Sequence, residues 1–259
     1  DKAEEIAMKA LELNPDLAQP YAVLGMIQCY VNWEWKKSGE TFRKAIKLNP
    51  NFALGHQYYA ELLEILNVRK EARREINRAM ELDPVFFMHR AVSSGMYYRE
   101  KKYKKSLEDR LIMLDIYPDY TQKSYRFFYL HLHMGNNKKA AKALREVMAN
   151  NPSKIKYVNT VMGIYQETGI DGLLKWLIQL ETEKSPQNGQ LIARLYALRG
   201  DKINALKWLE KAMEKRVPNL PRIAINPDFE ILRGEPRFVV LIDSMGLTSY
   251  HSWAQKSNR

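Results

Sequence analysis

The stretch FRKAIKLNPN, which runs from Phe42 to Asn51, returns 34 residues later as INRAMELDPV, from Ile76 to Val85. Prolines mark the same interval over most of the chain, and they are spaced 35 residues once and then 34 residues four times: Pro15, Pro50, Pro84, Pro118, Pro152 and Pro186. An internal period of this length indicates a repeat architecture, in which each repeat is one supersecondary unit.

Each repeat is predicted to contain two helices. The first three prolines end the phrase A-x-x-L-[ND]-P, in which Ala10, Ala45 or Ala79 lies five residues before the proline. Proline cannot continue a helix and disfavours the α region for the residue before it, so each phrase ends a helix. Between the prolines, apolar residues recur with a helical period.

Small residues predict that the two helices of a unit pack closely. When each unit is numbered from the third residue after its proline, the eighth position holds Gly25, Ala60 and Ser94, and the twentieth holds Ser38, Ala72, Ser106, Ala140 and Ala205. Short side chains allow antiparallel helices to approach. The fifteenth position holds Gly135, Gly169 and Gly200, where glycine can adopt the left-handed conformation that ends a helix.

The repeats also depart from this pattern. Phe128 and Met162 occupy the eighth position and Leu174 the twentieth, so we expect the fifth and sixth units to splay their helices or to shift locally. The second unit carries one extra residue near VNWEWKK, and the seventh is about three residues short before Ala193.

The chain resembles a tetratricopeptide repeat (TPR) array. The family pattern W-x-x-L-G-x-x-Y, A-x-x-x-F-x-x-A and P is matched by Tyr21, Leu24, Gly25, Ser38, Phe42, Ala45 and Pro50. The resemblance covers roughly residues 1–216 and implies an all-α, right-handed superhelical solenoid of antiparallel helix pairs with about six to seven repeats. Asp1 to Leu13 reads as only the second helix of a unit, so we interpret the chain as part of something longer.

A different pattern follows the repeats. Residues 225–247 are predicted to form a helical cap in which Asp228 begins a short helix, Pro236 occupies a first helical position and Gly246 ends the second helix. This ending resembles the P-x-F-x-x-L-R-x-x-P-R-F ending of TPR arms in bacterial signalling proteins and transcription regulators, through Pro227, Phe229, Leu232, Arg233, Pro236, Arg237 and Phe238. We therefore divide the chain into an array (1–216), a cap (217–247) and a tail (248–259), from which Tyr250 and Trp253 could dock back on the last helices.

The resemblance implies that first helices line the inner surface of the solenoid. Carried over residue by residue, the expected groove residues are Gln19, Met26, Tyr30, Gln57, Glu61, Tyr98, Arg99, Gln122, Tyr125, Tyr129, His133, Asn159 and Arg194. Tyrosines offer contact area and amides can pair with main chain, which suits a groove for an extended peptide. Tyrosines at helical spacing also pack between helices, and for Tyr125 and Tyr129 both interpretations stay open. The lysine and asparagine that bind chaperone tails in one TPR subtype are absent.

Basic residues gather in the turns between paired helices and define the "basic ridge": Arg69, Lys70, Lys101, Lys102, Lys104, Lys105, Lys138 and Lys139. A solvated edge explains such a run. Nucleic-acid or acidic-partner binding is the alternative function, because the formal net charge is +11. Self-association is a further alternative, since a repeat cut in two exposes an apolar end.

No catalytic constellation is found in the sequence. P-loop, G-x-G-x-x-G and G-x-S-x-G motifs are missing, and His131 and His133 would point to different faces of a helix. We expect no enzyme activity, no cofactor and no metal. The single cysteine, Cys29, excludes an internal disulfide framework and, with no signal-like or membrane-spanning apolar run, favours a cytoplasmic protein. The function predicted is that of a non-catalytic scaffold that binds a protein or peptide, as the regulatory arm of a larger bacterial signalling protein.

Overall fold

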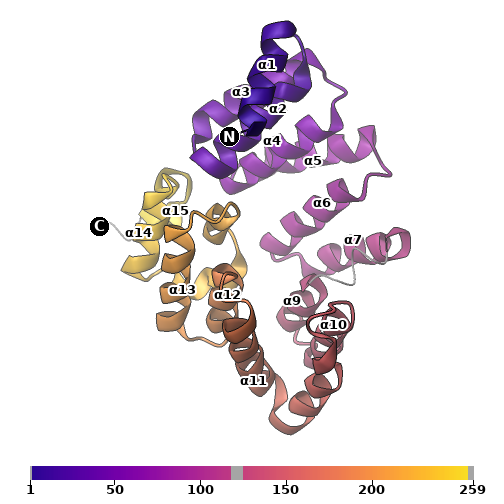
Figure 1. Cartoon of the computed structure of the whole chain (residues 1–259), viewed down its shortest axis with the longest axis vertical. Coiled ribbons are helices and arrows are strands. Elements are labelled where there is room, and N and C mark those ends of the chain that lie inside the picture. Colours follow the sequence, from indigo (N-terminus) through magenta and orange to yellow (C-terminus); the bar gives the residue numbers. More distant parts are fainter. Residues whose placement is uncertain (1, 118–124, 256–259) are drawn as a thin grey trace. The chain divides into compact units, whose positions relative to one another are not determined.

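Every regular element in residues 2–117 and 125–255, which the computed structural model describes, is a helix (Figure 1). In chain order the elements are α1 (Lys2–Leu13), α2 (Ala18–Ile27), η1 (Gln28–Asn32), α3 (Trp35–Leu48), α4 (Ala53–Ile65), α5 (Arg69–Leu82), α6 (Phe87–Arg99), α7 (Tyr103–Ile116), α9 (Arg126–His133), α10 (Asn137–Ala149), η2 (Ile155–Tyr157), α11 (Val158–Lys184), α12 (Gly189–Leu198), α13 (Lys202–Glu214), η3 (Leu220–Ala224), η4 (Pro227–Leu232), α14 (Pro236–Ser244), η5 (Thr248–Tyr250) and α15 (Ser252–Gln255). The predicted all-α class of helix pairs is confirmed.

The spaced prolines lie in the connections between helix pairs, as predicted. Pro15, Pro50, Pro84, Pro152 and Pro186 all fall between the last helix of one pair and the first helix of the next. Pro118 lies outside the described residues. No helix in the described part of the chain is both long enough and apolar enough to cross a lipid bilayer.

The chain forms two compact units, and each contains pieces from distant parts of the sequence. Unit 1 comprises Asp1–Ser93, Met213–Asn226 and Leu232–Arg259, and unit 2 comprises Ser94–Ala212 and Pro227–Ile231. The residues after α13 are therefore divided between the two units.

In unit 1, the small residues bring paired helices into close contact, as expected. The Ser38 Oγ on α3 donates a hydrogen bond to the Gly25 carbonyl oxygen on α2, at 2.8 Å. A Cβ atom added to Gly25 would lie 2.6 Å from Cε1 of Phe42, so the Phe42 ring fills the space that the glycine leaves. Ala60 and Ala72 occupy the same two positions in the next pair and are fully buried or nearly so.

Unit 2 repeats this contact in one pair and departs from it in the next two. The hydroxyl groups of Ser94 on α6 and Ser106 on α7 each donate to the carbonyl oxygen of the other residue, at 2.9 and 2.7 Å. Phe128 is fully buried in the core between α9, α10 and α11. Helix α11 is interrupted by a kink at Gly169, at φ 68° and ψ −161°, which separates the two helical segments of the sixth unit.

The turns between paired helices require a positive φ at one position. Gly135, Gly169 and Gly200 adopt positive φ values of 72°, 68° and 81°, which glycine tolerates readily. At Gly169 the ψ of −161° lies outside the left-handed helical region that the sequence analysis expects there. The equivalent turns in earlier repeats hold Trp33, Asn67 and Lys101 at φ 60°, 61° and 60°. These earlier turns thus have a positive φ at the same position although no glycine occupies it.

The extra residue in the second unit forms a turn of π-helix. The segment η1 continues α2 with i→i+5 geometry over Gln28–Asn32, just before the positive-φ residue Trp33. A π-helical turn lets a helix absorb one inserted residue without ending. The hairpin of α2 and α3 therefore keeps its register despite the 35-residue spacing.

The segments after the repeats fold much as predicted at the local level. Pro236 begins α14, Gly246 follows it at φ 66°, and Phe229 and Leu232 are buried in or next to the 3-10 helix η4. Within unit 1, the Trp35 Nε1 on α3 donates to the Met245 carbonyl oxygen at 2.8 Å. Trp253 stacks on Phe238 of α14, with ring centroids 5.6 Å apart.

Candidate functional site

The predicted groove residues fall into three groups. Gln19 and Asn159 are exposed, Met26 and Arg99 are half-buried, and Gln122 lies outside the described residues. Tyr30, Gln57 and Glu61 meet in unit 1, while Tyr98, Tyr129, His133 and Arg194 meet in unit 2. Tyr125 lies apart from both clusters, in a polar group of its own.

The unit 1 cluster surrounds Arg222, which belongs to η3 and not to a repeat. The Tyr30 hydroxyl donates to Glu61 Oε2 at 2.9 Å, and Arg222 Nη2 donates to the same hydroxyl at 2.6 Å and to Glu61 Oε2. Gln57 Nε2 donates to the other Glu61 oxygen, Oε1, at 2.9 Å. The first helices α2 and α4, with the η1 extension, thus hold a guanidinium from outside the array; this is the "Arg222 cluster".

The Arg222 cluster pairs opposite charges in a largely buried environment, with the Arg222 side chain 20% exposed and that of Glu61 10% exposed. Burial alone would lower the pKa of Arg222, but Tyr30 and Glu61 outweigh it and raise that pKa. Burial raises the pKa of Tyr30 well above its ordinary value, so its hydroxyl stays protonated and can donate. Burial likewise raises the pKa of the neighbouring Cys29 thiol to about 12, which leaves it unreactive at neutral pH.

The cluster extends to α6 through Gln57. His89 Nδ1 lies 2.6 Å from Gln57 Oε1, and because an amide oxygen only accepts, Nδ1 carries the proton and donates. Burial lowers the pKa of His89, so the ring is neutral in this tautomer. The polar groups of η1, α4 and α6 are therefore ordered along one chain of hydrogen bonds.

The unit 2 cluster surrounds Asp228 of η4, whose side chain is fully buried. The Tyr98 hydroxyl donates to Asp228 Oδ1 at 2.6 Å, and His133 Nε2 lies against the same oxygen. Arg194 Nε donates to Asp228 Oδ2, and Arg194 Nη2 donates to the Tyr98 hydroxyl at 2.8 Å. The guanidinium carbon of Arg194 also lies 3.2 Å from the ring centroid of Tyr129. The first helices α6, α9 and α12 supply this "Asp228 cluster".

The Asp228 cluster surrounds a buried carboxylate with hydrogen-bond donors and a guanidinium group. Burial alone would raise the pKa of Asp228, but Arg194 and His133 outweigh it and hold that pKa below its ordinary value. Burial raises the pKa of Tyr98 well above its ordinary value, so Tyr98 remains a donor. Charge-assisted hydrogen bonds of this kind are roughly twice as strong as neutral ones. Tyr103 stacks on His133 at 4.8 Å between ring centroids and fixes the plane of the imidazole.

Tyr125 and Tyr129 have different environments. Tyr129 is only 2% exposed and packs against Phe128 in the core of unit 2. Tyr125 is half-buried, and its hydroxyl donates to Glu181 Oε1 at 2.7 Å, beside the ion pair of Lys154 with the same oxygen. Burial raises the pKa of Tyr125, so this hydroxyl is protonated. Both tyrosines therefore have packing or hydrogen-bonding roles inside unit 2.

All eight residues of the basic ridge are exposed. Arg69 and Lys70 belong to unit 1, and the other six belong to unit 2. Lys101, Lys102, Lys104 and Lys105 line an open depression of about 430 Å³ together with Tyr103 and Met134. Lys101 pairs with Glu230 at 2.5 Å and Lys102 with Glu100 at 2.6 Å, so acidic neighbours offset part of this charge.

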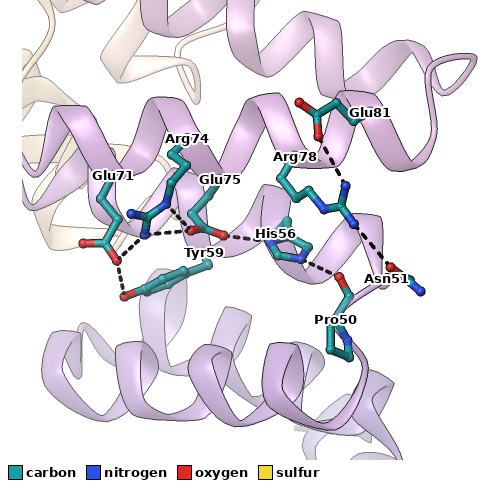
Figure 2. Close-up of polar contacts among 9 residues, drawn as sticks. All are labelled: Pro50, Asn51, His56, Tyr59, Glu71, Arg74, Glu75, Arg78 and Glu81. Carbon is teal, nitrogen blue, oxygen red and sulfur yellow. Dashed lines mark hydrogen bonds and ion pairs between the residues drawn. The ribbon is translucent and has the colours of Figure 1, made fainter.

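A buried charge that the sequence did not indicate joins α4 to α5 (Figure 2). His56 Nδ1 lies 2.7 Å from Glu75 Oε2, and His56 Nε2 lies 2.9 Å from the Pro50 carbonyl oxygen. Because both partners accept, both ring nitrogens must carry protons, and the ring is an imidazolium. The hydrogen bond from His56 to Glu75 raises the pKa of His56 and outweighs burial. Arg74 supports Glu75 at 3.2 Å on the outer side.

Sequence reasoning missed Arg222 and Asp228 as partners of the first helices. Both lie after the last repeat, and they bond to residues up to 192 positions away in the sequence. The family pattern assigns positions within a repeat and gives no rule for side chains that arrive from outside. No group of three or more metal-binding side chains occurs within residues 2–117 and 125–255.

Comparison with protein-family models and with curated protein sequences found no match. Among solved structures, the chain is similar to a chain of the APC/C hetero-tetramer Cut9–Hcn1, with a TM-score of 0.59 and 12% sequence identity over 95% of this chain and 46% of that chain. It also aligns with a chain of Naa15/Naa10 bound to HypK-THB, with a TM-score of 0.40 and 15% identity over 98% of this chain and 40% of that one. The chain thus spans less than half the length of either neighbour. The first likeness shows the fold, which is that of stacked TPR-like helical hairpins.

Proposed function

We propose that the chain is a non-catalytic scaffold that binds a protein or peptide through the surface formed by its first helices. One observation carries the proposal: in each unit, side chains of first helices bind a charged side chain from a segment that follows the repeats. Tyr30 and Glu61 hold Arg222, and Tyr98 with Arg194 holds Asp228. A surface that already binds 3-10 segments of its own chain has the chemistry to bind an extended peptide.

The physical basis is the combination of aromatic walls with paired charges. The rings of Tyr30 and Tyr98 lie against the guanidinium groups of Arg222 and Arg194 and supply contact area at low entropic cost, while the opposite charges of Glu61 and Arg194 supply charge-assisted hydrogen bonds. Such a surface discriminates between peptides by where their charges fall. The likeness to a chain of the hetero-tetramer Cut9–Hcn1 is in keeping with a role in assembling proteins.

The finer proposal is that the chain is the regulatory arm of a larger bacterial signalling protein. It depends on the resemblance of Pro227, Phe229, Leu232, Arg233, Pro236, Arg237 and Phe238 to the ending of such arms. Sequencing the coding region upstream of Asp1 tests it. A cyclase, kinase or winged-helix domain there supports the regulatory role, and a domain without signalling chemistry contradicts it.

The binding proposal is tested by selecting from a library of random peptides displayed on phage against the immobilised full chain. Enriched peptides are then synthesised and titrated against the chain by calorimetry. We expect saturable binding with one peptide for each chain. Failure to enrich any peptide above an immobilised unrelated helical protein contradicts the proposal.

The basic ridge supports a second candidate, which is nucleic-acid or acidic-partner binding. The four lysines around the open depression are its basis. Phosphate binding predicts an affinity that falls steeply with added salt and weakens when Lys101, Lys102, Lys104 and Lys105 are changed to Gln. Lack of binding to duplex and single-stranded DNA at low salt would exclude a nucleic-acid role.

A further inference from the structure

The segment Pro227–Ile231 is the only part of the sequence after Ala212 that belongs to unit 2. It adds five residues to a unit that otherwise consists of repeats. Asp228 is 3% exposed and Phe229 is 1% exposed, so two adjacent side chains of this segment are buried.

The Asp228 cluster recognises the carboxylate itself and not merely a polar group. Oδ1 accepts from Tyr98 and lies against His133, and Oδ2 accepts from Arg194. Without Asp228, the Arg194 guanidinium would remain over the Tyr129 ring without this counter-charge. Such a site has a strong preference for an anionic side chain, because a buried unpaired charge is costly.

The outer part of the same segment is bound differently. Glu230 is exposed and pairs with Lys101 at 2.5 Å, with both side chains about half accessible to solvent. Ile231 is 38% exposed. Exposed pairs contribute little to stability, so the buried aspartate carries most of the recognition.

We propose that Pro227–Ile231 occupies, as an intramolecular ligand, the site at which unit 2 binds a partner peptide through an aspartate side chain. This inference rests on the proposed function and adds the chemical class of the ligand. Tyr98, His133 and Arg194 then bind the partner's carboxylate. The partner must displace the internal segment, which competes at an effective concentration on the order of millimolar.

Competition of this kind makes the free chain a weak receptor. The apparent affinity for an external peptide falls by the fraction of molecules in which the site is open. Weakening the internal segment should therefore strengthen binding of an external one. If the segment only stabilised the fold, weakening it would not strengthen binding of an external peptide.

The probe is a fluorescein-labelled peptide NPDFEILR, which reproduces residues 226–233, and its partner probe has asparagine in place of the aspartate. Both are titrated by fluorescence anisotropy against the full chain, the Asp228→Asn variant and the Glu230→Gln variant. Glu230→Gln is the matched control, because it also neutralises an acidic residue of the segment but at the exposed pair.

We expect Asp228→Asn to bind the aspartate peptide about tenfold or more tightly than the unsubstituted chain does, and to prefer it about tenfold over the asparagine peptide. The Glu230→Gln variant should bind like the unsubstituted chain. Equal binding by the two variants, or equal binding of the two peptides, overturns the inference. Dimers of Asp228→Asn that bind neither peptide also overturn it, and they point to exchange of the segment between two copies.

A second measurement does not depend on a variant that folds. Hydrogen exchange is followed by mass spectrometry on the unsubstituted chain with and without millimolar aspartate peptide. Amides of residues 227–232 should lose protection when the peptide is present, and the asparagine peptide should have no such effect. Unchanged protection with both peptides overturns the inference.

The two proposals fail in different ways. If library selection yields binding peptides without an acidic preference, this inference is wrong and the peptide-binding function stands. If no peptide of any kind binds the chain, both are wrong.

Discussion

His56 Nδ1 on α4 lies 2.7 Å from Glu75 Oε2 on α5, and the second nitrogen of the same ring lies 2.9 Å from the carbonyl oxygen of Pro50. The imidazolium thus links the connection before α4, which contains Pro50, to α5, the second helix of the same pair. A buried charge on His56 therefore contacts the backbone of one of the regularly spaced prolines.

The first prediction concerns pH. The pKa of His56 is higher in the folded chain than in the unfolded chain. Its contribution to the free energy of unfolding is therefore fully present below the unfolded pKa and is lost as pH rises through the folded pKa. The folded pKa of Glu75 is lowered, so its contribution is lost as pH falls through that value. His56→Gln should therefore cost about 1–3 kcal/mol of unfolding free energy near pH 6, and less at pH 8. Urea unfolding of both proteins at the two pH values measures this, and an equal cost at both would contradict it.

The second prediction concerns close packing between paired helices. Gly25→Ala places a Cβ 2.6 Å from the Phe42 ring, so the ring must move. We expect a loss of about 1–3 kcal/mol in unfolding free energy. Gly39→Ala is the control, because Gly39 also lies in a helix of unit 1 but its added Cβ would make only ordinary contacts at 3.5 Å. A loss of similar size in both variants would show that contact with the Phe42 ring is not responsible.

The third prediction isolates backbone conformation at a turn. Gly135 at φ 72° and Gly163 within α11 both have open space around an added Cβ. Gly135→Ala should destabilise the chain by about 1–2 kcal/mol because alanine disfavours positive φ. Gly163→Ala should stabilise it by roughly 0.5–1 kcal/mol because alanine favours helix. Thermal unfolding followed by circular dichroism compares them, and midpoints that shift in the same direction would refute the interpretation.

The fourth prediction concerns the buried ion pair of Lys154 and Glu181. Glu181 is fully buried and Lys154 nearly so. Lys154→Met alone should cost about 3–5 kcal/mol, since it leaves the carboxylate without its cation. Adding Glu181→Leu should recover most of that loss, as replacement of a whole buried pair is often close to neutral. Urea unfolding of the double-mutant cycle tests this, and additive losses would contradict it.

Much of the architecture could be predicted from spacing, because the repeat depends on local rules. The prolines end helices, and Gly25 with Ser38 or Ser94 with Ser106 permit close contact, so the pairs follow from the sequence. The extra residue near VNWEWKK was recognised, but its π-helical turn was not, since several local adjustments could absorb one residue. The positive φ of Lys101, 60°, could not be predicted from the sequence, because lysine rarely adopts that conformation.

The candidate site was only half predictable. Position within the repeat predicts Tyr30, Glu61, Tyr98 and Arg194 as groove residues, and this stays a prediction. The structure groups the first two around Arg222 in unit 1 and the last two around Asp228 in unit 2, and both partners come from segments that follow no repeat rule. Which charges meet across more than 100 residues depends on the tertiary fold. Composition and periodicity do not contain that information.

The most direct measurement is to map where a bound peptide lies. A peptide enriched from the random library is synthesised with a photoreactive benzophenone residue, cross-linked to the full chain, and located by mass spectrometry. We predict that the cross-links fall on the first helices α2, α4, α6, α9 and α12. Cross-links confined to the second helices α3, α5, α7, α10 and α13, or to the lysines of the basic ridge, would contradict binding through the first-helix surface.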